Sequence, residues 1–317
     1  MKSLLEVKNL TKEFNGFKAV NNVSFEAYAG EVFGLLGPNG AGKTTTIRVI
    51  ATTLTASSGT ATVAGFDIKK QPEKVRSNIG VLTTDIGVYE RLSGRENLKY
   101  YGQLNGMSNV ELDEKINEVS RLLDMEDFVD RRASKYSTGM KQKLAIARSV
   151  IHDPKVVIFD EPTAGLDVLA SQNIMRFMKK EKTAGKLVIL STHEMTDAEK
   201  LCDRVAIIHQ GKIVTVDTVD SIKEKTQAND LEEAFVKLVH GSNISTLTQT
   251  TREKQSKESN KKKIGWIVRI GAIVLIAVGF LFSFLEISRV VFYIFLALGI
   301  VMSFIGKYAF KEKKEKE

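Results

Sequence analysis

The chain has 317 residues, which allows one α/β domain of ordinary size and an additional segment. Its single cysteine, Cys202, excludes a disulfide framework, and residues 1–10 alternate like a strand and do not resemble a secretory signal. Much of the formal net charge of +8 comes from lysines that bracket two apolar runs near the carboxyl end, which indicates a membrane surface and argues against nucleic acid as a partner.

Residues 1–240 have the pattern of a globular α/β domain, in which strand-like segments alternate with amphipathic helical windows. The runs 156–159 and 187–190 are continuously apolar and rich in β-branched residues, so we expect central parallel strands there. Within residues 110–129, apolar positions recur at helical spacing and predict one buried helix face, formed by Val110, Ile116, Val119, Leu122 and Leu123. We assign no chemistry to that helix.

A glycine-rich loop follows the strand-like run 32–36. Residues 37–45 fit the phosphate-loop pattern G-x-x-x-x-G-K-S/T, and a segment compatible with a helix comes next. Such a loop turns backbone amides toward a triphosphate, and the start of the helix adds partial positive charge. We expect Lys43 to contact the β- and γ-phosphates and to act in catalysis, Thr44 to bind Mg²⁺, and Thr45 to bind phosphate. The predicted nucleotide-binding loop consists of Gly37, Pro38, Asn39, Gly40, Ala41, Gly42, Lys43, Thr44 and Thr45.

Two adjacent carboxylates end the apolar run 156–159. The carboxyl ends of parallel strands are where open α/β sheets place ligand chemistry. We expect Asp160 to hold Mg²⁺ through water and Glu161 to orient or deprotonate the attacking water. This pair favours hydrolysis over phosphoryl transfer to a second substrate. The alternative, an acidic pair on the surface, would not end an apolar strand.

Taken together and in this order, these motifs make the chain resemble the nucleotide-binding subunits of ATP-binding cassette (ABC) transporters. The resemblance covers about Leu4 to His240. Residues 136–140, Tyr-Ser-Thr-Gly-Met, look like the family signature L-S-G-G-Q, and residues 164–167 look like its D-loop. The resemblance implies a P-loop NTPase fold with an antiparallel β subdomain and a helical subdomain. It also implies a dimer in which the signature of one protomer, here Ser137 and Gly139, caps the ATP held by the phosphate loop of another.

The resemblance also implies roles for three more residues. His193 follows the apolar run 187–190 and looks like the switch histidine that contacts the γ-phosphate during catalysis. Asp167 lies in the D-loop and joins the nucleotide-binding set. Phe14 looks like the aromatic residue that stacks on adenine; a core phenylalanine is the alternative reading, and Phe17 is a competing candidate for the contact.

The sequence departs from the family pattern at two places. The family usually has a glutamine that joins Mg²⁺ to the transmembrane partner where this chain has Thr84 and Asp85. A threonine is too short for that role unaided, so the residue that replaces the glutamine stays open. The signature has Thr138 and Met140 in place of glycine and glutamine, while its serine and second glycine remain.

Composition changes after residue 240. Residues 241–263 are rich in Ser, Thr, Gln, Asn and Lys, which is typical of a flexible polar linker. Residues 264–308 contain two uncharged apolar runs separated by residues 286–289, and we expect a two-helix transmembrane hairpin with both ends in the cytoplasm. Few polar residues interrupt these runs, which disfavours a buried soluble hairpin. Residues 309–317 would form a charged cytoplasmic tail.

The predicted function is the ATPase subunit of an ABC exporter, which binds two ATP with Mg²⁺ at a dimer interface and drives efflux through a separate transmembrane permease. The runs 136–142, 191–195 and 201–204 resemble the subfamily with sodium-efflux and drug-efflux ATPase subunits. A soluble-type ABC ATPase acting on ribosomes or DNA is disfavoured by the lone phosphate loop and the lack of heptads. A membrane-anchored regulatory ABC ATPase is a further alternative. The predicted location is the cytoplasmic face of the cell membrane.

Overall fold

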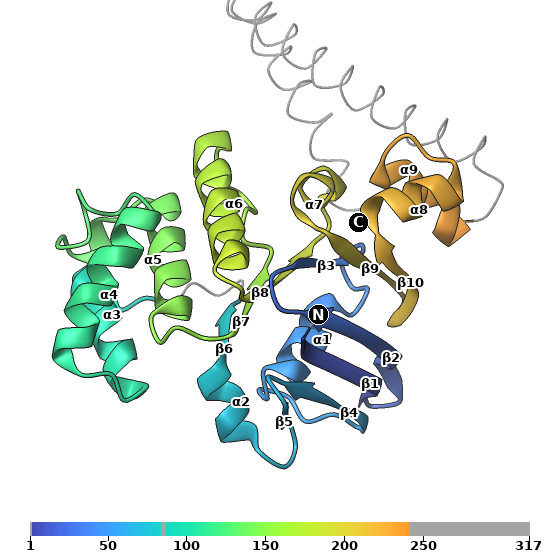
Figure 1. The fold of residues 1–317 in the computed structure, drawn as a ribbon, viewed down its shortest axis with the longest axis horizontal. Coiled ribbons are helices and arrows are strands. Elements are labelled where there is room, and N and C mark those ends of the chain that lie inside the picture. The colour runs from blue at the N-terminus through green and yellow to red at the C-terminus, as the bar shows by residue number, and fades with distance from the viewer. Residues whose placement is uncertain (1, 84–86, 241–317) are drawn as a thin grey trace, which may run out of the picture. The chain divides into compact units, whose positions relative to one another are not determined.

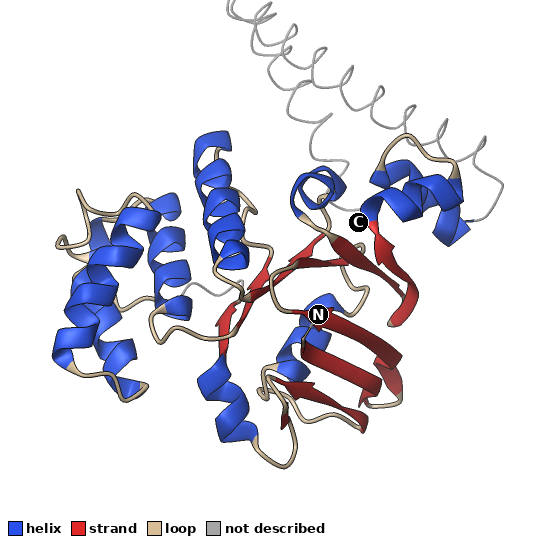
Figure 2. Cartoon of the chain, in the orientation of Figure 1, coloured by secondary structure: helices blue, strands red, loops and turns tan. Residues whose placement is uncertain are grey.

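The computed structural model of the chain describes residues 2–83 and 87–240, which belong to one compact unit that ends at Gly241. Two β-sheets and a separate group of helices make up this unit, as Figure 1 shows along the chain and Figure 2 by secondary structure. The smaller sheet is antiparallel and has the strand order β2-β1-β4-β5. Its strands are β1 (Ser3–Phe14), β2 (Phe17–Tyr28), β4 (Ser58–Val63) and β5 (Phe66–Asp67).

A tight hairpin joins β1 to β2. Its turn residues Asn15 and Gly16 both have positive φ, 47° and 85°. Two consecutive positive φ values are the requirement of the two-residue turn that matches the twist of the flanking strands. The turn therefore places Phe14 directly opposite Phe17 at the end of the ladder.

The larger sheet has the strand order β10-β9-β3-β8-β7-β6 and is parallel from β9 to β6. Its strands are β3 (Val32–Leu36), β6 (Ile79–Leu82), β7 (Val156–Asp160), β8 (Leu187–Thr192), β9 (Arg204–His209) and β10 (Lys212–Thr218). Both faces of this sheet are covered: Phe33 and Leu35 belong to the core shared with the small sheet, while Val32 and Leu36 belong to the core on the opposite face. Burial on both faces explains the continuous apolar runs of β7 and β8, which are the parallel strands that the sequence predicts.

Helices cover both faces of the large sheet. Helix α1 (Lys43–Ile50) contacts both sheets, and α6 (Val168–Thr183) and α7 (Met195–Leu201) contact β3 and β8. A helical subdomain, drawn in green in Figure 1, contains α3 (Gly94–Leu104), α4 (Asn109–Leu122), η1 (Ala133–Lys135) and α5 (Thr138–Val150). The remaining helices are α2 (Pro72–Asn78), α8 (Val219–Thr226) and α9 (Leu231–His240).

Local signals fix the starts of α3 and α4 in the helical subdomain. Ser93 before α3 and Ser108 before α4 each form a reciprocal capping box with the glutamate three residues later. Such caps satisfy backbone amides that the first helical turn leaves without partners. They set the starts of α3, on which α5 packs, and of α4, which packs on α3.

The predicted transmembrane hairpin requires a correction. In the part of the chain that the structure describes, no helix combines the length and apolar character needed to cross a bilayer. The longest helix there, α6, has 16 residues; at 1.5 Å per residue it extends about 24 Å, against about 30 Å for the hydrocarbon core of a bilayer. Over the described residues, 2–83 and 87–240, the fold class is corrected to an α/β domain without a transmembrane hairpin, and the prediction of a location that includes such a hairpin is corrected with it. Residues 264–308, on which that prediction was based, lie outside the described residues, as do 241–263 and 309–317.

Candidate active site

The phosphate loop connects the end of β3 to the start of α1. Gly42 stands at the N-cap of α1 with φ 106°, and a Cβ there would lie 2.4 Å from Ala19 O. A Cβ at Gly37 would lie 2.2 Å from Ile208 O. Both positions therefore require glycine. No side chain among the described residues caps α1, so the amides of its first turn stay free to bind an anion.

Lys43 lies inside the curve of this loop. Its side chain is 5% exposed, and its Nζ donates hydrogen bonds to Gly37 O at 2.6 Å and Pro38 O at 3.3 Å. The same Nζ lies 3.5 Å from Glu161 Oε1. The ammonium therefore stands between the loop and the end of β7, where a bound phosphate could replace the two carbonyl oxygens as its partner.

Two hydroxyl groups hold the carboxylate of Asp160. Thr44 Oγ1 donates to Oδ2 at 2.8 Å, and Ser191 Oγ donates to Oδ1 at 2.7 Å. Asp160 is 1% exposed, and it pairs with Ser191 in the parallel register of β7 and β8. A carboxylate beside a hydroxyl is the hard oxygen chemistry that Mg²⁺ prefers, so the donors present fit the metal that the sequence predicts.

Glu161 forms a second polar cluster with His193. Nδ1 of His193 lies 2.9 Å from Oε1 and 3.0 Å from Oε2, and Thr192 Oγ1 donates to Oε2 at 3.4 Å. An ionised carboxylate only accepts hydrogen bonds, so this contact places the imidazole proton on Nδ1. Glu161 has φ 52°, a left-handed conformation that is uncommon for a residue with a side chain. Its amide donates to Ser191 O at 2.9 Å, which secures this backbone turn.

The signature lies beside the first turn of α6, the helix that follows the D-loop, and apart from the phosphate loop of the same chain. Ser137 caps α5 by accepting a hydrogen bond from Met140 N at 3.3 Å, and Asp167 caps α6 by accepting one from Ala170 N at 2.8 Å. A Cβ at Gly139 would meet Ala170 Cβ at 3.9 Å and nothing nearer. In Figure 1, the strands β6 and β7 lie between α5 and α1. The signature is therefore not part of the phosphate site of its own chain.

Phe14 and Phe17 lie at the end of the β1–β2 hairpin and are exposed, by 43% and 67%. The alternative reading of Phe14 as a core residue is therefore wrong. The Nζ of Lys12 lies 4.8 Å from the centre of the Phe14 ring. The choice between the two rings as adenine contact stays a prediction. Thr84 and Asp85 lie outside the described residues.

Two polar residues near this site were not predicted from the sequence. Ser191 orients Asp160, and Gln142 of α5 donates from Nε2 to Pro162 O, in the turn after β7, at 2.8 Å. Gln142 lies on the buried side of α5, where an amide side chain needs a partner. That burial was the signal that could have identified it.

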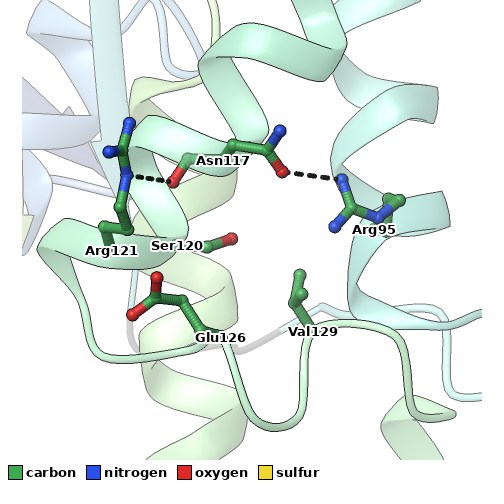
Figure 3. Close-up of a pocket in the computed structure, with 6 residues that line it drawn as sticks. All are labelled: Arg95, Asn117, Ser120, Arg121, Glu126 and Val129. Carbon is green, nitrogen blue, oxygen red and sulfur yellow. Dashed lines mark hydrogen bonds between the residues drawn. The ribbon is translucent and has the colours of Figure 1, made fainter.

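A separate pocket of about 200 Å³ lies in the helical subdomain. Figure 3 shows the residues that line it: Arg95, Asn117, Ser120, Arg121, Glu126 and Val129. Arg95 donates to Asn117 Oδ1 at 3.2 Å, and Arg121 donates to Asn117 O at 3.3 Å. The buried Ser120 hydroxyl has no partner among the described residues. None of the six belongs to the predicted phosphate, metal or signature sets, so this pocket is distinct from the candidate active site.

Comparison with known proteins agrees with this geometry. Residues 20–164 match the family model described as ABC transporter. The chain is 43% identical over 226 residues to the ABC transporter ATP-binding protein NatA of Bacillus subtilis (strain 168), covering 71% of this chain and 92% of that protein. It is 37% identical over 227 residues to the daunorubicin/doxorubicin resistance ATP-binding protein DrrA of Streptomyces peucetius, covering 72% of this chain and 69% of that protein. A solved structure of an ATP binding subunit of an ABC transporter matches with a TM-score of 0.69 and 31% identity, over 74% of this chain and 99% of that one.

The fold and the phosphate loop define a P-loop NTPase. The chain belongs to the ABC transporter family as an ATP-binding subunit, and it is an ATPase. The family resemblance drawn from the sequence is thereby confirmed.

Proposed function

We propose that this ATPase drives export, and that two copies of it bind two ATP molecules at their interface. The observation that carries the dimer is the setting of Gly139. Nothing among the described residues crowds this glycine and its φ is not positive, yet it lies in the first turn of a helix that can bind phosphate. A ligand that is held by a second copy and approaches this position closely would explain why the residue here has no side chain.

In the proposed site, each residue of the cluster has a defined task. The amides of residues 37–45 and Lys43 bind the β- and γ-phosphates of ATP. Thr44 and Asp160 hold Mg²⁺, which when bound neutralises charge on the phosphate oxygens. Glu161 orients the attacking water and accepts its proton, while His193 holds the Glu161 carboxylate and faces the γ-phosphate.

The names of the relatives support the proposed direction and cargo of transport. Relatives named for resistance to a drug include DrrA and the linearmycin resistance ATP-binding protein LnrL of Bacillus subtilis (strain 168), which is 35% identical to this chain. Resistance of this kind is consistent with efflux. We infer that the chain works with a separate membrane-spanning permease, and that the cargo is a drug or Na⁺.

Changing Gly139 to aspartate tests the dimer. We expect Gly139→Asp to bind ATP as the wild type does and to keep its melting temperature, because a Cβ is accommodated within the chain. The new carboxylate would repel the phosphates of the partner's nucleotide, so ATP-driven dimerisation should be lost and turnover should fall at least about 100-fold. Light scattering with ATP and phosphate release measure the two effects.

A matched control places the same charge elsewhere in the helical subdomain. Val110 is 73% exposed on α4, and Val110→Asp should dimerise and hydrolyse ATP normally. Normal dimerisation of Gly139→Asp would contradict the shared site.

Export is tested in cells that contain the permease. Expression of the wild-type chain should raise resistance to daunorubicin or linearmycin, or tolerance of Na⁺, and expression of Glu161→Gln should not. The comparison of drug and Na⁺ challenges assigns the cargo. Equal sensitivity of both strains to every challenge would contradict export of these substrates.

A further inference from the structure

Gln142 links the signature helix to the turn that follows the catalytic strand. Its side chain is 7% exposed, and its Nε2 donates to Pro162 O at 2.8 Å. Pro162 is the residue directly after Glu161. A buried hydrogen bond therefore joins α5 to the backbone beside the proposed base.

The turn after β7 also forms a hydrogen bond to α7. Thr163 Oγ1 donates to Asp197 Oδ2 at 3.3 Å, and Asp197 lies in α7, the helix that follows His193. Proline fixes its own φ, so one of the two backbone rotations at Pro162 that could absorb a displacement of its carbonyl oxygen is lost, and more of that displacement passes into the backbone of Glu161. Glu161 is already in a left-handed conformation. The position of its carboxylate therefore depends on both attachments.

Helix α5 can carry a displacement from the signature to this bond. Ser137 is the N-cap of α5, and Gln142 lies five residues further on, about 7.5 Å along the helix axis at 1.5 Å per residue. A short hydrogen-bonded helix moves as one body. Any movement of Ser137 toward or away from a nucleotide therefore moves Nε2 of Gln142.

We propose that Gln142 is a positioning residue, through which the signature of a protomer sets the position of that protomer's own Glu161. The inference rests on the proposed dimer: the signature contacts ATP that is held by the second copy, and Gln142 passes this occupancy to the site of its own chain. Its consequence is that each ATP site sets the hydrolytic geometry of the other. ATP hydrolysis should then be cooperative in ATP concentration.

The test is Gln142→Met in the full chain, because methionine keeps the length of the side chain and removes the donor. We expect kcat to fall at least about tenfold, since small misplacement of a reacting group has effects of that size. The KM for ATP should stay within about threefold, because the contacts to ATP are intact. The Hill coefficient for ATP should fall toward 1. The matched control is Gln103→Met, which removes an exposed amide that donates to Asn109 Oδ1 at 3.0 Å and should change none of these values.

A second variant, Gln142→Glu, keeps the length but presents a carboxylate to the Pro162 carbonyl, and it should lower kcat more than methionine does. In a Glu161→Gln background, adding Gln142→Met should leave ATP-driven dimerisation intact. If Glu161→Gln alone does not dimerise with ATP, the proposed function fails. If it does dimerise, a wild-type kcat and Hill coefficient in Gln142→Met overturn the positioning role. A lowered melting temperature with an unchanged Hill coefficient overturns it too, because that result identifies a structural role.

Discussion

Replacing Glu161 with glutamine should slow ATP turnover by about 10²–10⁴-fold while ATP binding is kept. Glutamine has the shape of glutamate and can still accept a hydrogen bond from His193 Nδ1, so the cluster should keep its geometry. It cannot accept a proton from water. The substitution also removes the negative charge 3.5 Å from Lys43 Nζ, which frees the ammonium to bind phosphate. The variant should therefore accumulate as an ATP-bound dimer.

Phosphate release at saturating ATP and Mg²⁺ measures the rate, and light scattering measures the dimer. The matched control is Glu194→Gln, which changes the other carboxylate near His193, at 3.4 Å from Nε2. The Glu194 side chain is exposed and lies on the far side of the ring from Glu161, so turnover should stay close to that of the wild type. Wild-type turnover in Glu161→Gln would remove Glu161 from the mechanism.

The sequence predicted the parts of the site that depend on local pattern. Residues 37–45 follow an apolar run and precede a helix, and this order alone indicates a phosphate loop. Asp160 ends an apolar strand, which predicts its place at the edge of a parallel sheet. The direct contact between Glu161 and His193 depends instead on two strands being neighbours and on a left-handed turn at Glu161. Neither condition is visible in a single run of residues.

Residues that act through tertiary contacts were harder to predict. In the sequence, nothing distinguishes Ser191 from other polar residues near the end of a strand. Its role follows only from its position opposite Asp160 in the register of β7 and β8. A helix face was predicted within residues 110–129, and the helix spans Asn109–Leu122, but Val110 is exposed and Leu112 is buried in its place. The capping box at Ser108 starts the helix and thereby turns Val110 toward solvent. A periodic pattern gives the face of a helix less reliably in its first turn, where the cap decides the orientation.

Asp160→Asn should raise the Mg²⁺ concentration needed for half-maximal ATPase activity by about 10–100-fold, the range found when groups that orient a bound metal are removed. The carboxylate accepts from Thr44 on one oxygen and from Ser191 on the other. Asparagine has one oxygen, so one of the two hydroxyls must turn and accept from the new amide. The charge that attracts Mg²⁺ is lost, and Thr44 loses its fixed orientation.

The rate as a function of free Mg²⁺ at constant ATP measures this effect, and ATP binding without Mg²⁺ serves as the internal control. That binding should be unchanged or tighter, because a negative charge near the phosphates has gone. The melting temperature should not fall, since a buried charge is replaced by a neutral group of the same shape. Ser191→Ala is the matched variant: it removes one hydrogen bond but keeps the carboxylate, so its Mg²⁺ dependence should shift less than that of Asp160→Asn. An unchanged Mg²⁺ dependence in Asp160→Asn would show that the metal is held by other groups. A shift in Ser191→Ala as large as that in Asp160→Asn would show that orientation, and not charge, is the larger contribution of this strand end.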